Sequence, residues 1–224
     1  MSRWHAVLWG IVALAHGCTN YDPGKIALNA ASPEGVILMK LTPSPIVYSL
    51  TIQKFDAPNQ RLLGGSFSGG WANFEELSSQ PYVAKSVAPG TYVVTSLAQQ
   101  TWWTACFQDG TYSFEVKPGE VVYLGTFNAL PSLVALSLHV KREGPSMTSR
   151  SVYYFDRNPV PNFSFSANRE AELAQAQGYV KAQMPHVDAP VALAELHATK
   201  FGTGSDAFGL QRVCGGYYKQ PPSK

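Results

Sequence analysis

Residues 114–127 read FEVKPGEVVYLGTF, two apolar segments joined by a Pro–Gly pair. The segment 110–116 alternates apolar and polar side chains, which is typical of a strand with one buried face. The segment 121–127 is apolar on both faces, as expected of a more central strand. The stretch therefore predicts two strands that meet at a sharp corner.

A second Pro–Gly pair lies upstream in KSVAPGTYVVTS, residues 85–96. Proline presets φ at the second position of a β-turn, and glycine supplies the positive φ that the third position of a type II turn requires. We therefore expect Pro89, Gly90, Pro118 and Gly119 to be structural turn residues. Because type II turns splay tight hairpins, either corner is also suited to carrying the chain from one sheet to another.

Other short segments rich in β-branched and aromatic residues are separated by Pro and Gly. The further strand candidates are 35–41, 45–55, 82–87, 91–98, 101–107 and 133–140. In the last of these, one predicted face carries Val134, Leu136, Leu138 and Val140. Many short strands with turn signals predict a mainly β fold, an antiparallel β-sandwich.

One segment near the C-terminus has a helical rather than a strand pattern. In residues 167–185, Asn168 is a suitable N-cap, acidic residues follow in the first turn, and Pro185 is a stop signal. One face of this helix carries Leu173, Ala176, Val180 and Met184. We expect a single C-terminal amphipathic α-helix packed on the sandwich.

The N-terminal residues have the features of an export signal. Arg3 is followed by an uncharged, mostly apolar run from Ala6 to Ala15, and Gly17 directly precedes Cys18. This end resembles the lipobox of bacterial lipoproteins, although Ala15 and His16 differ from the usual pattern, and the resemblance implies lipidation of Cys18. Plain secretion after cleavage is the alternative.

These signals divide the chain into four expected regions. They are a signal peptide (1–17), a lipid-anchored tether (18–34), a sandwich domain (35–160) and a C-terminal helix and tail packed on it (161–224). If Cys18 carries lipid, Cys106 and Cys214 remain for a disulfide in an oxidising compartment. Two separate thiols are the alternative.

The fragments APGTYVV and FEVKPGEVVYLGTF, and the helix ending AQMP, carry a family resemblance. Over residues 35 to about 140 the chain resembles uncharacterised bacterial envelope lipoproteins with an immunoglobulin- or transthyretin-like sandwich. This resemblance implies no catalytic residues. The lipobox resemblance, in which Thr19 rather than Asp follows Cys18, implies the outer membrane, facing the periplasm, as the location; the alternatives are a periplasmic or a secreted protein.

Composition and motifs exclude some classes of function. With 17 basic and 15 acidic residues and no basic run, the chain lacks the footprint of a nucleic-acid-binding protein. The histidine at 186 in HVD has no accompanying ligand spacing, so no metal site is predicted, and no cofactor motif is present. No catalytic constellation stands out, which favours a non-enzymatic protein.

The leading hypothesis is an exported, lipid-anchored envelope protein that binds or scaffolds another envelope component. Its expected partners are the membrane, through Cys18, and another envelope protein or peptidoglycan. An alternative is a glycan-binding module that uses the aromatic residues Trp71, Trp102 and Trp103 as a stacking platform. A second alternative is a hydrolase whose catalytic set is not visible in the sequence.

Overall fold

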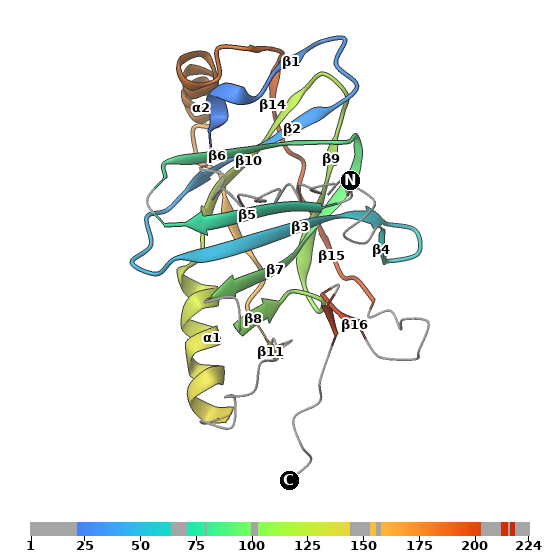
Figure 1. The fold of residues 1–224 in the computed structure, drawn as a ribbon, viewed down its shortest axis with the longest axis vertical. Coiled ribbons are helices and arrows are strands. Elements are labelled where there is room, and N and C mark those ends of the chain that lie inside the picture. The colour runs from blue at the N-terminus through green and yellow to red at the C-terminus, as the bar shows by residue number, and fades with distance from the viewer. Residues whose placement is uncertain are drawn as a thin grey trace, which may run out of the picture.

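The computed structural model describes residues 22–63, 71–78, 80–99, 103–143, 153–155, 158–202, 212–214 and 216–217. Within these residues, two sheets pack face to face around one large apolar core, and two α-helices lie toward opposite ends of the molecule (Figure 1). The mainly β, sandwich-like fold expected from the sequence is confirmed.

The first sheet has five strands. They are β2 (Gly35–Leu41), β6 (Tyr82–Val87), β10 (Val121–Asn128), β12 (Asn162–Ser164) and β14 (Val191–Leu193). This sheet is mixed, because β10 runs parallel to β2 and β14 but antiparallel to β12.

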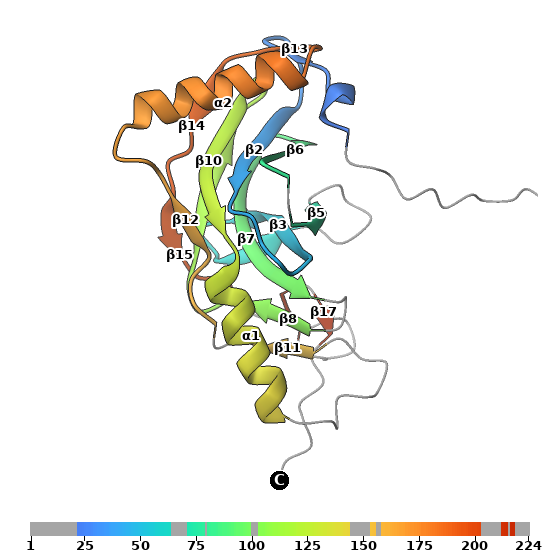
Figure 2. The ribbon, with the colours of Figure 1, turned by 90° about the vertical axis from the view of Figure 1, so that its left-hand side faces the viewer.

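The second sheet has eight strands and curls strongly (Figure 2). They are β3 (Tyr48–Asp56), β4 (Arg61–Leu63), β5 (Trp71–Leu77), β7 (Gly90–Gln99), β8 (Trp103–Cys106), β9 (Thr111–Val116), β11 (Tyr153–Phe155) and β15 (His197–Thr199). Most of its pairs are antiparallel, and β8 with β11 is a parallel pair.

The remaining elements are short pairs and helices. The parallel pair is β1 (Leu28–Asn29) with β13 (Val187–Asp188), and the antiparallel pair is β16 (Arg212–Val213) with β17 (Gly216–Tyr217). The helices are the 3₁₀ turn η1 (Pro23–Lys25), α1 (Leu130–Glu143) and α2 (Arg169–Gln183).

Strand β10 is buried on both faces, as its sequence predicts. Val122 and Leu124 point into the core between the sheets. Val121 and Tyr123 point to the opposite face, into a second apolar cluster that α2 covers. The first sheet is therefore the middle layer of the molecule, between the second sheet and α2.

Both Pro–Gly corners carry the chain from one sheet to the other. The corner at Pro89 and Gly90 joins β6 of the first sheet to β7 of the second. The corner at Pro118 and Gly119 joins β9 of the second sheet to β10 of the first. The interpretation of these residues as sheet-crossing turns is confirmed.

The two corners differ in backbone conformation. Gly119 has φ of +65°, close to the value at the third position of a type II turn. Gly90 has φ of +143°, far from the value of about +80° at the third position of a type II turn. The prediction of a type II turn at the first corner is therefore wrong. At this corner the hydroxyl of the buried Tyr92 donates a 2.6 Å hydrogen bond to the carbonyl oxygen of Ala88. Burial raises the pKa of Tyr92 to about 12, with a further contribution from the charge of Glu34.

The segment 133–140 is helical, so its assignment as a strand is wrong. It lies within α1, where Leu133 and Leu136 are fully buried at helical spacing. The helix begins where the side chain of Asn128 accepts a 3.0 Å hydrogen bond from the backbone N–H of Leu130, and Pro131 lies in its first turn. A long apolar run fits both periods, so this start signal distinguishes the helix from a strand.

The helix predicted after Asn168 is confirmed as α2. The side chain of Asn168 accepts a hydrogen bond from the N–H of Ala171, and the helix ends before Pro185. On the predicted apolar face, Ala176, Val180 and Met184 are buried against β2 and β10. The helix therefore caps the outer face of the first sheet.

Two expected region boundaries do not separate structural units. Residues 22–34 are not a free tether, because Leu28 is buried and β1 pairs with β13. Residues beyond 160 supply β12 and β14 to the first sheet and β15 to the second. Residues 22–34 thus belong to the folded domain, and the C-terminal region is part of both sheets.

Replacing Gly119 by Val should lower the free energy of unfolding by about 2–4 kcal/mol. A Cβ atom there would lie 2.6 Å from the carbonyl oxygen of Ala30, and the positive φ disfavours a β-branched residue. Urea unfolding measures the change. The matched control is Gly178→Ala in α2, where no atom lies within 4 Å of the new Cβ and stability should rise by about 1 kcal/mol. A Gly119→Val protein as stable as the parent would contradict this account.

Candidate functional site

The outer face of α1 carries large apolar side chains that the fold leaves exposed. Leu130, Val134 and Leu138 follow each other at spacings of four residues and are 49%, 50% and 61% exposed. Residues four apart lie on one side of a helix, so the three form one row, which we call the α1 stripe. An apolar row of this kind is a candidate interaction surface.

The α1 stripe ends in positive charge. Lys141 and Arg142, in the last turn of α1, are exposed and lie one turn beyond Leu138. The first turn contains no acidic residue, and Glu143 at the last position is the only acid in the helix sequence. Cations at a helix C-terminus interact favourably with the helix dipole. The surface that α1 presents is therefore apolar with a basic end.

A groove of about 350 Å³ lies between α2 and the segment 187–191. Its lining includes the buried side chains of Val180 and Met184 and the exposed charges of Lys181 and Asp188. Lys181 is basic and Asp188 is acidic, so the charged side chains of this open groove favour neither anions nor cations. The described lining therefore does not indicate a class of ligand.

A buried carboxylate lies beneath α2. Glu172 is 6% exposed, and its oxygen Oε1 accepts hydrogen bonds from the hydroxyls of Tyr123 (3.0 Å) and Thr126 (3.3 Å). Its other oxygen accepts from the backbone N–H of Ser166. These donors compensate the cost of burying the charge. Burial, followed by the interactions with Glu172, raises the pKa of Tyr123 well above its ordinary value.

Because its oxygens are occupied by three donors, Glu172 holds α2 on the sheet. Tyr82 stacks on Tyr179 of α2 at 4.4 Å between ring centroids and closes the same cluster. The sequence places Glu172 in the first helical turn but does not predict its burial. The sequence feature that points to a buried acceptor is the hydroxyl of Tyr123, which lies in the mostly apolar strand β10 and donates to Glu172.

The cysteines Cys106 and Cys214 lie at disulfide distance, with their Cα atoms 5.8 Å apart, as the sequence predicts. Both are buried in a small apolar cluster with Phe55 and Phe201. The side-chain amide of Gln53 donates to the carbonyl oxygen of Cys214. The described C-terminal residues are thus held against the second sheet.

The tryptophans proposed as a glycan platform do not converge among the described residues. The backbone of Trp71 opposes Gln53, near the end of β3. Trp103 opposes Gln99, which pairs with Tyr48 at the start of β3. The two backbones lie roughly 20 Å apart along the sheet. The Trp103 ring is half-buried against the main core, and Trp102, like Cys18, lies outside the described residues.

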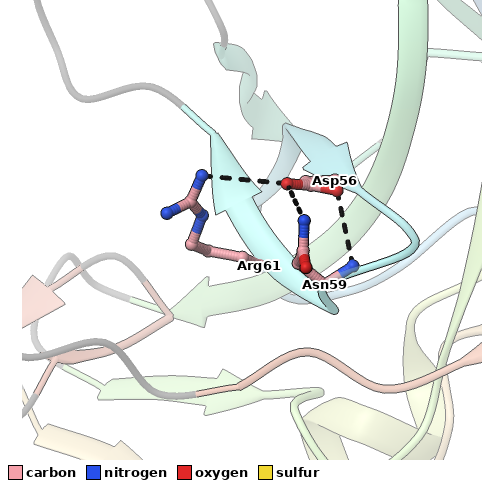
Figure 3. Close-up of polar contacts among 3 residues, drawn as sticks. All are labelled: Asp56, Asn59 and Arg61. Carbon is pink, nitrogen blue, oxygen red and sulfur yellow. Dashed lines mark hydrogen bonds and ion pairs between the residues drawn. The ribbon is translucent and has the colours of Figure 1, made fainter.

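A polar cluster at the β3–β4 turn is explained by the turn itself. Asp56 accepts hydrogen bonds from the backbone and side chain of Asn59 and lies 3.7 Å from Arg61 (Figure 3). The carboxylate stabilises the turn and compensates the positive φ of Gln60. It is a turn motif.

In the described part of the chain, no group of three His, Cys, Asp or Glu side chains is arranged to hold a metal ion. His186 and His197 are exposed, and the partner of His197 is Glu195 at 4.0 Å. Neither α1 nor α2 is long and apolar enough to cross a membrane.

Comparison of the chain with protein-family models, with curated proteins and with solved structures found no match. The resemblance to envelope lipoproteins therefore stays a prediction from short motifs.

Replacing Glu172 by Gln should lower the free energy of unfolding by about 1–3 kcal/mol, because an amide NH₂ then faces one of the three donors. The matched control is Glu170→Gln in the same helical turn, whose exposed side chain loses only about 0.3–1 kcal/mol of dipole interaction. Urea unfolding of both variants measures the difference. Equal losses would show that the buried hydrogen bonds contribute nothing.

Peptide mapping without reductant should find Cys106 linked to Cys214 in protein from an oxidising compartment. The bond spans 108 residues, so reduction should lower the free energy of unfolding by about 4–5 kcal/mol in the chain-entropy account. The control is the Cys106→Ser, Cys214→Ser double variant, whose stability should not respond to reductant. A free thiol at Cys106 would refute the pairing.

Proposed function

We propose that this chain is a lipid-anchored cell-envelope protein with a non-enzymatic role in binding or scaffolding another envelope component. The run from Ala6 to Ala15 followed by Gly17 and Cys18 supports export and anchoring. The disulfide distance between Cys106 and Cys214 fits an oxidising compartment such as the periplasm.

The binding role is supported above all by the α1 stripe. Leu133 and Leu136 already bury the inner side of α1 in the core, so Leu130, Val134 and Leu138 are not needed for packing within the fold. Large apolar side chains grouped on a surface mark interaction sites more often than isolated ones do. Fold alone does not specify a function, so this surface carries the proposal.

Changing Cys18 to Ala should move the protein from the membrane fraction to the soluble fraction of cells. The reason is that the lipid on Cys18 supplies the anchor, and no helix in the described residues is able to replace it. Immunoblots of separated fractions measure the shift, and Cys214→Ser, which leaves Cys18 in place, is the control. Continued membrane retention of the Cys18→Ala protein would overturn the anchoring.

A further inference from the structure

The first described residues and the α1 stripe lie at opposite ends of the molecule. The first described residues, η1 and β1, lie beside the end of α2, where the N–H of Leu28 donates to the carbonyl oxygen of His186. Figures 1 and 2 both place this end at the top and α1 at the bottom of the long axis. Strand β10 connects the two ends, since Val121 bonds Pro190 beside α2 and Asn128 caps α1.

The chain before Asp22 is short enough to keep the α2 end of the molecule close to the anchoring membrane. Only Thr19, Asn20 and Tyr21 separate Cys18 from Asp22, a reach of at most about 14 Å. The eight residues of β10 span about 26 Å, and the 14 residues of α1 extend about 21 Å more. With Cys18 in the membrane and the long axis of the molecule upright, α1 lies at the end away from that membrane.

Charge argues against a second copy of this chain as the occupant. Antiparallel pairing of two α1 helices puts Lys141 and Arg142 against the partner's helix N-terminus, which carries partial positive charge and no acid in its first turn. Parallel pairing brings four cations together against only two acids, the Glu143 of each copy. Three half-exposed side chains also fall well short of the roughly 800 Å² per partner of a stable dimer.

We propose, on the basis of the anchoring proposed above, that the α1 stripe docks a protein partner on the side away from the membrane. This partner presents an amphipathic helix with apolar side chains at helical spacing and carboxylates beside them. Leu130, Val134 and Leu138 contact the apolar side chains, and Lys141 and Arg142 pair with the carboxylates. The small area makes the contact weak and reversible.

The test uses the full chain carrying Cys18→Ala and a fluorescent synthetic helical peptide with leucines on one face and flanking glutamates. Fluorescence anisotropy should detect binding. Replacing the peptide's glutamates by glutamines, or making Lys141→Glu with Arg142→Glu, should weaken binding about three- to tenfold. Leu138→Gln should weaken it about tenfold or more by removing apolar contact area.

Controls separate binding from folding and from anchoring. Gln is a good helix former, so α1 should persist in Leu138→Gln, and Val134→Gln is a second variant with the same expected loss. Leu63→Gln, at an exposed apolar position on β4, should leave peptide binding unchanged. Because the peptide assay does not use Cys18, its outcome is independent of the fractionation experiment.

Three outcomes overturn the inference. The first is equal binding of the glutamate and glutamine peptides, or no binding of either. The second is Leu138-dependent flotation with vesicles of anionic phospholipid, which assigns the stripe to a membrane. The third is a concentration-dependent dimer, in sedimentation, that Leu138→Gln abolishes, which assigns it to a second copy.

Discussion

The fold depends on burying both faces of one strand, β10. Its side chains alternate between the core of the sandwich and the cluster under α2, so the strand requires a cover on each side. A sharp corner at Pro118 and Gly119 brings the chain from β9 in the second sheet to β10 in the first. Gly119 approaches Ala30 so closely that no side chain fits, and its N–H donates a 2.7 Å hydrogen bond to the carbonyl oxygen of Glu34. The N-terminal segment is packed in place by the same contact.

The two helices at the two ends of β10 differ in how they treat apolar surface. Helix α2 covers apolar surface and encloses a carboxylate, whose charge is compensated by Tyr123, Thr126 and Ser166. Helix α1 continues directly from β10, buries one side against the core and leaves apolar side chains on the other. A helix that only completed the core would not need Leu138. This difference is the reason why the proposed binding surface is placed on α1.

The positions of α1 and α2 at opposite ends fit the proposal of a protein anchored to a membrane at one end and bound to a partner at the other. In the proposed setting, lipid at Cys18 fixes the α2 end near a membrane and leaves α1 free to meet a partner. The middle of the molecule is then a spacer whose rigidity comes from two packed sheets. The contact between Cys106 and Cys214 adds to that rigidity, since it closes the C-terminal residues onto β8.

Local signals in the sequence determined much of this architecture. Three kinds of element could be predicted because each depends on residues close together in the chain. They are the corners at Pro89 and Pro118, the strand 121–127 that is apolar on both faces, and the capped helix after Asn168. Strands such as β5, β12 and β14 were not predicted, because they are ordered by neighbours distant in sequence. The apolar run 133–140 fits a strand or a helix, and the cap from Asn128 and the core around Leu133 and Leu136 decided for the helix. Only the tertiary structure exposed the α1 stripe and buried Glu172, since burial depends on what packs against a residue and not on the residue itself.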